Sequence, residues 1–311
     1  VSPGPGGAPA PVAWDWIEDR LVVTYVPDAQ GQAIAAGDAV LAIDGKPVAQ
    51  ALAEAEALRS GATPQWIRYR AIYDLGAGPA GKPLTLEIEP LGAKAVRRTV
   101  SLKRAGSPPV EPRPEKIQEL EPGIFYVDLT RITDADWKAS VETLAKAKGI
   151  VFDLRGYPSL GPRWLTHLSP LPLTSAQWHV PLVTEPDRRN MKFTRSGEWR
   201  LVPSPPYLAA KKAVLTNASA ISYAESTMGI IENYKLAEIV GGATAGTNGN
   251  INPIRIPGGY TIIWTGMKVL KHDGSQHHGV GIRPTIPAAR TRAGVAAGVD
   301  EVLERGIRAV E

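Results

Sequence analysis

The chain has 311 residues, of which 43% are hydrophobic and 21% charged, a composition typical of a globular protein rather than a disordered one. Its length favours two domains. The net charge of +4 is small and the charges are interspersed, which argues against a nucleic-acid partner. There is no cysteine, so disulfides, thiolate zinc sites and a cysteine nucleophile are excluded, and no apolar run is long enough to span a membrane.

The first third of the chain is predicted to be mainly β. Residues 1–13 are rich in proline, glycine and alanine and are predicted to form a linker or tail. The chain begins with valine and shows no signal peptide, so we expect it to be a piece of something longer. A helix is expected at 51–58, where alanine, leucine and glutamate dominate. Strands are expected at 21–26, 37–43, 46–48, 84–89 and 96–102.

One motif in this region is informative about its fold. Residues 37–48, GDAVLAIDGKPV, read as an apolar strand, an Asp-Gly turn and a second short strand. With the following helix and paired strands, this stretch resembles a PDZ domain of the bacterial, protease-associated type over about residues 16–104, which predicts a PDZ-like domain at 14–104. The resemblance implies a groove that accepts an extended peptide by strand addition. The alternative is that the same fold serves only as a spacer.

A proline-rich linker at 105–116 is predicted to separate this domain from a second one at 117–311. There the pattern changes to strand, helix and strand at 124–129, 134–148 and 150–156, a unit that predicts a parallel sheet with flanking helices. Residues 157–207 show little periodicity and are expected to form an irregular covering segment that shapes a cleft. Further strands are expected at 213–216, 236–240, 260–264 and 267–270, and a closing amphipathic helix at 298–310.

The stretch 211–234, KKAVLTNASAISYAESTMGIIENY, predicts a buried strand, a turn of small residues and a helix. This geometry exposes a serine hydroxyl at the end of a sheet and directs helix N–H groups towards it. Ser219, Ser222 and Ser226 lie in or near the turn. Taken by themselves, such serines are more often caps and small packing residues.

A glycine-rich loop follows at 241–250. It lacks the G-K-[ST] ending of a phosphate-binding loop and does not open a helix in a G-x-G-x-x-G frame, so a nucleotide site is disfavoured. We interpret the glycines as allowing close approach of the backbone to a bound chain or to a neighbouring turn.

Several segments, taken in order, resemble one family. They are GIFYVDL, KGIVFDLRG, AVLTNASAISYAES, IVGGATAGTNG and HHGVGIRPT. Together they look like the catalytic core of the C-terminal-processing and tricorn-like serine peptidases over about 122–306. The resemblance implies an α/β fold of the crotonase/Clp type with a mostly parallel sheet, preceded by the mainly-β PDZ-like domain.

The resemblance also implies site residues. The family's S-x-x-E pattern falls on Ser222 and Glu225, which makes Ser222 the implied nucleophile. The Tyr223 amide is the implied oxyanion donor, and a second donor is expected from the turn at Gly156. Residues 156–159 depart from the glycine-rich sequence that the family usually shows at this turn.

The general base is not evident from the pattern. The lysine position of the C-terminal-processing branch falls on Thr247, so the Ser–Lys arrangement is excluded. The tricorn-like branch uses a histidine before the PDZ domain, which we expect on a portion upstream of Val1 unless another residue replaces it. His278 occupies a place where the family has a glutamate near the catalytic centre, and it could act as base or orienting residue. The histidines are His167, His179, His272, His277 and His278, and they form no strong metal-ligand set.

The sequence therefore predicts a serine endopeptidase whose peptide or unfolded-protein substrate is positioned by the PDZ-like domain, without a metal or organic cofactor. The alternative is a non-catalytic peptide-binding or ligand-binding module on the same fold. An acyl-CoA enzyme of the crotonase type is disfavoured, because that chemistry needs no serine at the elbow. The family resemblance also implies a location outside the cytoplasm, and the oligomeric state is left open.

Overall fold

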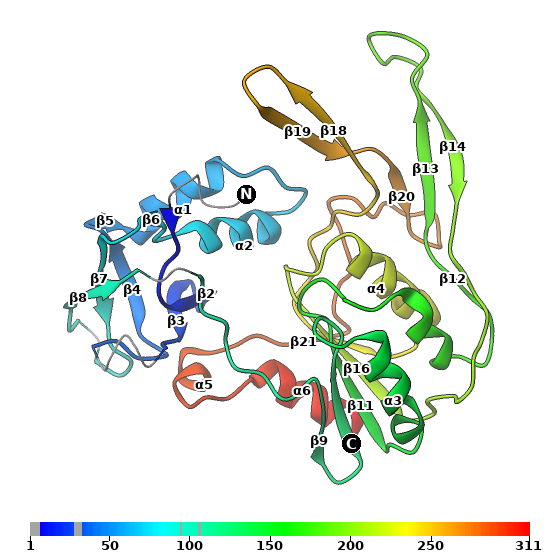
Figure 1. Ribbon diagram of the computed structural model, residues 1–311, viewed down its shortest axis with the longest axis horizontal. Helices are drawn as coiled ribbons and strands as arrows, with labels where there is room; N and C mark the ends of the chain where they lie inside the picture. Colours follow the sequence, from blue (N-terminus) through cyan, green and yellow to red (C-terminus); the bar gives the residue numbers. More distant parts are fainter. Residues whose placement is uncertain (1–6, 28–32, 94, 105–106) are drawn as a thin grey trace. The chain divides into compact units, whose positions relative to one another are not determined.

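The computed structural model describes residues 7–27, 33–93, 95–104 and 107–311, which form two compact units. The chain passes between the units at Arg113 and Pro114, inside the proline-rich stretch. Unit 1 comprises Val1–Ser60, Ile67–Arg113 and Ala288–Val302, and unit 2 comprises Gly61–Trp66, Pro114–Pro287 and Leu303–Glu311. Residues 1–6 and 105–106 of the two predicted linkers lie outside the described residues. Figure 1 labels the elements of both units.

Unit 1 is built on an antiparallel sheet in the order β2-β3-β4-β7-β8, with β5 paired to β4 and a small β1-β6 pair beside it. Successive side chains of a strand point to opposite faces of the sheet, so Leu84, Leu86 and Ile88 of β7 all lie on its buried face. The strands are β1 Gly7–Ala8, β2 Ala13–Ile17, β3 Arg20–Tyr25, β4 Ala39–Ile43, β5 Lys46–Pro47, β6 Gly78–Pro79, β7 Pro83–Glu89 and β8 Arg98–Lys103. The helices are α1 Val48–Ala57, α5 Arg292–Ala296 and α2 Pro64–Asp74, of which Pro64–Trp66 is counted with unit 2.

Unit 1 differs from the sequence expectation at both of its ends. The described part of the predicted tail is not a free linker, since Ala10 and Val12 are buried in the core. Far along the chain, the buried side chain of Arg292 donates to the Gly37 carbonyl (3.0 Å) and pairs with Glu89 (3.2 Å). These bonds join α5 to the sheet of unit 1. Because the partners are far apart in the chain, no local sequence pattern predicts the pairing.

Unit 2 contains the predicted mostly parallel sheet, in the order β21-β17-β16-β11-β10-β9. Every neighbouring pair is parallel except β9 with β10. The strands are β9 Ile117–Glu121, β10 Ile124–Asp128, β11 Gly149–Asp153, β16 Lys211–Thr216, β17 Glu238–Gly241 and β21 Ile286–Pro287. The helices are α3 Asp134–Leu144, α4 Tyr223–Tyr234 and α6 Glu301–Val310.

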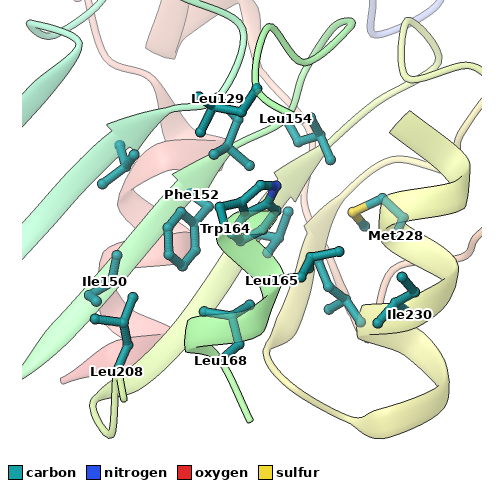
Figure 2. Packing of buried hydrophobic residues seen from close by; sticks show 14 of the residues in the cluster. Leu129, Ile150, Phe152, Leu154, Trp164, Leu165, Leu168, Leu208, Met228 and Ile230 are labelled. Carbon is teal, nitrogen blue, oxygen red and sulfur yellow. The ribbon is translucent and has the colours of Figure 1, made fainter. Parts of the chain in front are cut away.

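The core of unit 2 forms where β11 packs against a short 3-10 helix, Pro162–His167, and against α4. Figure 2 shows Phe152 of β11 beside Trp164, with Met228 of α4 across the cluster. The Phe152 and Trp164 ring centroids are 5.0 Å apart. Helix α3 begins at Asp134 as expected and ends at Leu144, before the predicted 148; its N-cap residue is Thr133, whose hydroxyl accepts the Asp136 N–H.

Residues 157–207 are more regular than predicted, because they contain a hairpin of β13 (Gln177–Leu182) and β14 (Lys192–Gly197). Strand β20, Lys268–Leu270, joins β13 to complete a three-stranded sheet, and the short strands β12 (Leu173–Thr174) and β15 (Arg200–Leu201) pair with each other. Strands β18 (Ile251–Ile256) and β19 (Tyr260–Thr265) form a separate two-stranded hairpin (Figure 1). Among the helices of the described residues, none has the length and apolar character required to cross a membrane.

Candidate active site

The carboxyl ends of β11 and β16 bring the two predicted site turns to one edge of the parallel sheet. Asp153 and Leu215 are in register, and Leu154 N–H donates to the Leu215 carbonyl (3.0 Å). Beyond β16 the chain turns and enters α4 at Ser222, while beyond β11 it turns at Gly156. Because the carboxyl ends of neighbouring parallel strands lie together, the sheet itself pairs these segments.

Ser222 is the N-cap residue of α4 and has an unusual backbone conformation, with φ 57° and ψ −111°. A serine rarely adopts positive φ, and such strain is characteristic of a nucleophile elbow. The residue is partly exposed, whereas Ala224 in the next turn is buried. As the N-cap residue, Ser222 lies beside the free N–H groups and the positive dipole end at the start of α4.

Glu225 holds the serine turn and the glycine-rich loop together from inside the protein. Its buried carboxylate accepts hydrogen bonds on Oε1 from the Gly246 N–H (2.7 Å) and the Thr244 hydroxyl (2.6 Å). On Oε2 it accepts the Thr247 N–H at 2.9 Å and the Ser222 N–H at 3.3 Å. The Ser222 N–H also donates to the Thr247 carbonyl at 2.9 Å. The backbone of the candidate nucleophile is thus fixed by two partners.

The glycines of the 241–250 loop serve close approach to a neighbouring turn, one of the two uses expected from the sequence. Gly246 and Gly281 both have positive φ, 70° and 68°, and a Cβ built on Gly281 would lie 3.0 Å from Gly246 Cα. The Gly279 N–H donates to the Gly246 carbonyl at 2.9 Å. The loop therefore connects the serine turn to the turn that carries His277 and His278.

The turn at Gly156 is held by the residues before it and contacts the start of α4. Arg155 pairs with the buried Asp153 through Nη2 and Oδ2 at 2.6 Å, and its N–H donates to Asp153 Oδ1 at 3.0 Å. Gly156 itself has φ 153° and lies against Thr130. The Tyr157 and Tyr223 rings are 5.9 Å apart, and the Tyr223 hydroxyl donates to the Leu160 carbonyl at 2.7 Å. These contacts bring the 156–160 turn to the residue that follows Ser222.

The neighbouring serines have structural partners. The Ser219 hydroxyl donates to Asn217 Oδ1 at 2.5 Å in the turn after β16. Ser226 is buried and shares a hydrogen bond with Asn248 (Oγ to Oδ1, 3.2 Å). Of the three, Ser222 combines partial exposure, backbone strain and a helix N-terminus.

The structure separates the two adjacent histidines of the 277–280 turn. The side chain of His278 is exposed, and its carbonyl accepts the Gln276 side-chain amide at 2.5 Å. His277 is buried, with Nε2 3.4 Å from Glu225 Oε2 but outside hydrogen-bonding geometry. Elsewhere His272 Nε2 contacts the Thr174 carbonyl at 2.7 Å, and His167 Nδ1 the Pro206 carbonyl at 3.0 Å. In the described part of the chain, no three acidic or histidine side chains converge as metal ligands.

Sequence reasoning missed the structural role of Glu225 and the burial of His277. It named Glu225 as part of the S-x-x-E pattern. The sequence feature that could have indicated the burial of Glu225 is the run of small and apolar residues from Ala224 to Ile231. Such a run favours a helix start that is buried on all sides. Nothing local distinguishes His277 from His278, because their burial depends on the close approach of Gly246 and Gly281.

Comparison with known proteins identifies the family of the chain. The model of peptidase family S41 matches residues 123–288, more than half of the chain. The chain belongs to peptidase family S41. As a member it is a serine-type peptidase, a hydrolase that acts on peptides or proteins, and the family expected from the sequence is confirmed. No curated protein matches the sequence significantly.

Solved structures share the fold at low sequence identity. Mature CPAF complexed with lactacystin is 15% identical, with a TM-score of 0.72 over 97% of this chain and 82% of that chain. A putative S41 protease from Bacteroides fragilis is 14% identical, with a TM-score of 0.50 and coverages of 97% and 82%. A putative peptidase from Parabacteroides merdae is 19% identical, with a TM-score of 0.54 and coverages of 62% and 63%. These likenesses establish an S41 peptidase fold of mixed α/β content.

The Glu225 network leads to a testable prediction for this S41 peptidase. In Glu225→Gln, one carboxylate oxygen becomes an NH₂ group that faces two hydrogen-bond donors, so two of the four donors of the serine turn and loop lose this acceptor. We expect the free energy of unfolding in urea to fall by about 1–3 kcal/mol. We also expect the rate at which a fluorophosphonate labels Ser222 to fall more than about tenfold, or by more than 1.4 kcal/mol in activation free energy.

The matched control is Glu232→Gln on the same helix, where the carboxylate pairs with Lys271 (2.9 Å) and is partly exposed. This change should cost less than about 1 kcal/mol and leave labelling unchanged. If both variants behave alike, Glu225 does not hold the serine turn.

A second prediction concerns Tyr223. Burial, reinforced by the nearby Tyr157, raises the pKa of the Tyr223 hydroxyl to about 12. Because the folded pKa lies above the ordinary tyrosine value of 10.0, the hydroxyl contributes stability that is complete below pH 10 and is lost as the pH rises towards 12. The difference in tyrosinate absorbance between the native chain and Tyr223→Phe should therefore show one group titrating near pH 12. A difference curve centred near pH 10 would contradict the buried hydrogen-bonded position.

Proposed function

We propose that this S41 peptidase cleaves peptide bonds with Ser222 as its nucleophile. The observation that carries the proposal is the strained, partly exposed position of Ser222 at the N-terminus of α4, with its N–H held by Thr247 and Glu225. A hydroxyl fixed in this way needs little reorganisation before attack, because its backbone is already held in the reacting conformation.

In the proposed reaction the Ser222 oxygen attacks the scissile carbonyl, and its proton passes to a histidine. The oxyanion is stabilised by the Tyr223 N–H and by the N–H of Gly156. Collapse of the tetrahedral species breaks the C–N bond, and the histidine returns the proton to the leaving amine. Water then hydrolyses the acyl-enzyme through the same proton transfer. No step calls for a metal or organic cofactor.

We assign the proton transfer to His278, which is exposed on the turn that Gly246 joins to the serine loop and would replace the upstream histidine of the tricorn-like branch. Thr247, at the lysine position of the C-terminal-processing branch, has no basic side chain, which favours a histidine over a lysine as base. His277, buried beside Glu225, supports the turn from within.

The substrate class follows from the family and from unit 1. We propose that unit 1 is a PDZ-like domain, that it binds an extended or unfolded polypeptide by strand addition, and that unit 2 is a crotonase/Clp-type core. The antiparallel sheet of unit 1, with the Asp44-Gly45 turn between β4 and β5, supports the first assignment. We further propose an extracytoplasmic location, as the resemblance of the sequence implies.

The test of the nucleophile is covalent labelling followed by peptide mapping. A fluorophosphonate should modify the native chain at Ser222, and Ser222→Ala should abolish both labelling and hydrolysis of an unfolded protein substrate. Ser219→Ala is the control, since this partly exposed serine lies in the same turn but hydrogen-bonds to Asn217. Labelling that persists in Ser222→Ala would reject the assignment.

The test of the base is the pH–rate profile of His278→Ala. Loss of a general base should lower kcat about 10²- to 10⁴-fold and remove the decline in rate at acidic pH, where a protonated imidazole cannot accept a proton. His272→Ala is the control, because its ring is engaged with the Thr174 carbonyl. An unchanged profile in His278→Ala would place the base elsewhere.

A further inference from the structure

The carboxyl ends of β10 and β11 bury two neighbouring carboxylates. Asp128 and Asp153 are in register on these parallel strands, and both are fully buried. The buried hydroxyl of Tyr126 donates to Asp153 Oδ2 at 2.9 Å and lies within hydrogen-bonding distance of Asp128 Oδ2, at 3.2 Å. Asp128 Oδ2 also pairs with Arg131 Nε at 2.6 Å. Asp153 Oδ2 pairs with Arg155 Nη2 at the same distance, so one hydroxyl bridges two ion pairs.

A buried pair of like charges is costly in free energy. Each carboxylate loses its hydration, and the two repel each other unless cations and hydrogen-bond donors compensate them. Apolar side chains of similar volume often stabilise a fold as well as buried ion pairs do. Stability alone therefore does not account for this cluster, and the segments that the carboxylates hold indicate its use.

The two carboxylates hold the backbone and the side chain that adjoin Gly156. Asp153 Oδ1 accepts the N–H of Arg155, the residue before this glycine, at 3.0 Å. Asp128 Oδ1 accepts both the N–H of Thr130 at 2.9 Å and its hydroxyl at 2.6 Å. Thr130 lies directly against the glycine, because a Cβ built on Gly156 would be 3.1 Å from Thr130 Cγ2. Gly156 is thus placed between a residue fixed by Asp153 and a residue fixed by Asp128.

Backbone hydrogen bonds join the same two turns. The Leu129 N–H donates to the Asp153 carbonyl at 3.0 Å, and the Ser159 N–H donates to the Leu129 carbonyl at 2.9 Å. The turn after β10 and the turn after β11 therefore hold each other on both sides of Gly156. A change in the position of one turn moves the other, because these buried hydrogen bonds are costly to leave unmade.

We propose that Tyr126 and Asp128 are positioning residues for the oxyanion donor at Gly156. The inference rests on the proposed peptidase function and adds to it residues of β10, a strand that carries no other group of the proposed reaction. The Tyr126 hydroxyl fixes the two carboxylates relative to each other, and Thr130 and Arg155 pass that position on to Gly156. A donor that is held in place stabilises the developing oxyanion without reorganisation, and a displacement of about 1 Å is enough to slow the reaction strongly.

The test is Tyr126→Phe, which keeps the ring and removes the hydroxyl. We expect the rate constant for fluorophosphonate labelling of Ser222 to fall about tenfold or more, because the phosphonyl oxygen takes the place of the oxyanion. With fluorescently labelled, denatured casein as substrate, kcat should fall by a similar factor while KM changes less than about twofold. The final extent of labelling separates positioning from folding, since unfolded chains lower the extent and a misplaced donor lowers only the rate.

A second variant and a control accompany this change. Thr130→Val keeps a methyl group beside Gly156 and removes the hydroxyl that Asp128 accepts, at a partly exposed position that tolerates substitution more readily. It should slow labelling about two- to tenfold at full extent. The control is Thr166→Val, which removes a buried hydroxyl that donates to the Arg163 carbonyl in the 3-10 helix at 2.6 Å. It should be labelled at the rate of the native chain.

The other outcomes overturn the proposal. If Tyr126→Phe reaches full extent at the native rate, or raises KM with kcat unchanged, the hydroxyl does not position the donor. If Tyr126→Phe does not fold, an unchanged rate in Thr130→Val rejects the proposal instead. Equal slowing in Thr166→Val shows that the loss of any buried hydroxyl has this effect. A native chain left unmodified at Ser222 rejects the proposed peptidase function and this inference with it, whereas a labelled native chain with unaffected variants rejects the inference alone.

Discussion

The buried carboxylate of Glu225 is the interaction on which the candidate active site depends. A carboxylate without compensating partners is costly to bury. Here both oxygens accept hydrogen bonds from N–H and O–H donors of the helix start and the 244–247 loop. Because each donor would be left unsatisfied if the loop moved away, the carboxylate couples the position of the loop to that of Ser222. His277 completes the burial from the turn behind it.

The candidate active site also depends on the parallel sheet, which brings segments that are far apart in the chain to one common edge. Neighbouring parallel strands end on the same side, so the turns after β11 and β16 meet without a dedicated connection. The start of α4 adds N–H donors and a favourable dipole at that edge. The Tyr157 and Tyr223 contact and the hydrogen bond to the Leu160 carbonyl then fix the distance between the two turns.

Unit 2 distributes its apolar residues in two different ways. In the core, Phe152, Trp164 and their neighbours exclude water, and their burial stabilises the fold. On the β18–β19 hairpin, isoleucine, tyrosine and tryptophan side chains remain largely exposed to water, so they contribute less to folding than the core residues do. A two-stranded hairpin is only marginally stable by itself.

Sequence alone determined the strands and helices of strong period, the strand-turn-helix around Ser222 and the family, because these depend on residues close together in the chain. The alternation in 84–89 and the apolar run at 213–216 are read locally and reappear as β7 and β16. Only the tertiary structure decided that Ala10 belongs to a core, that Arg292 joins α5 to unit 1, and that His277 rather than His278 is buried. These outcomes depend on contacts between residues distant in sequence. Their energies come from burial and hydrogen bonding that exist only once the chain has folded.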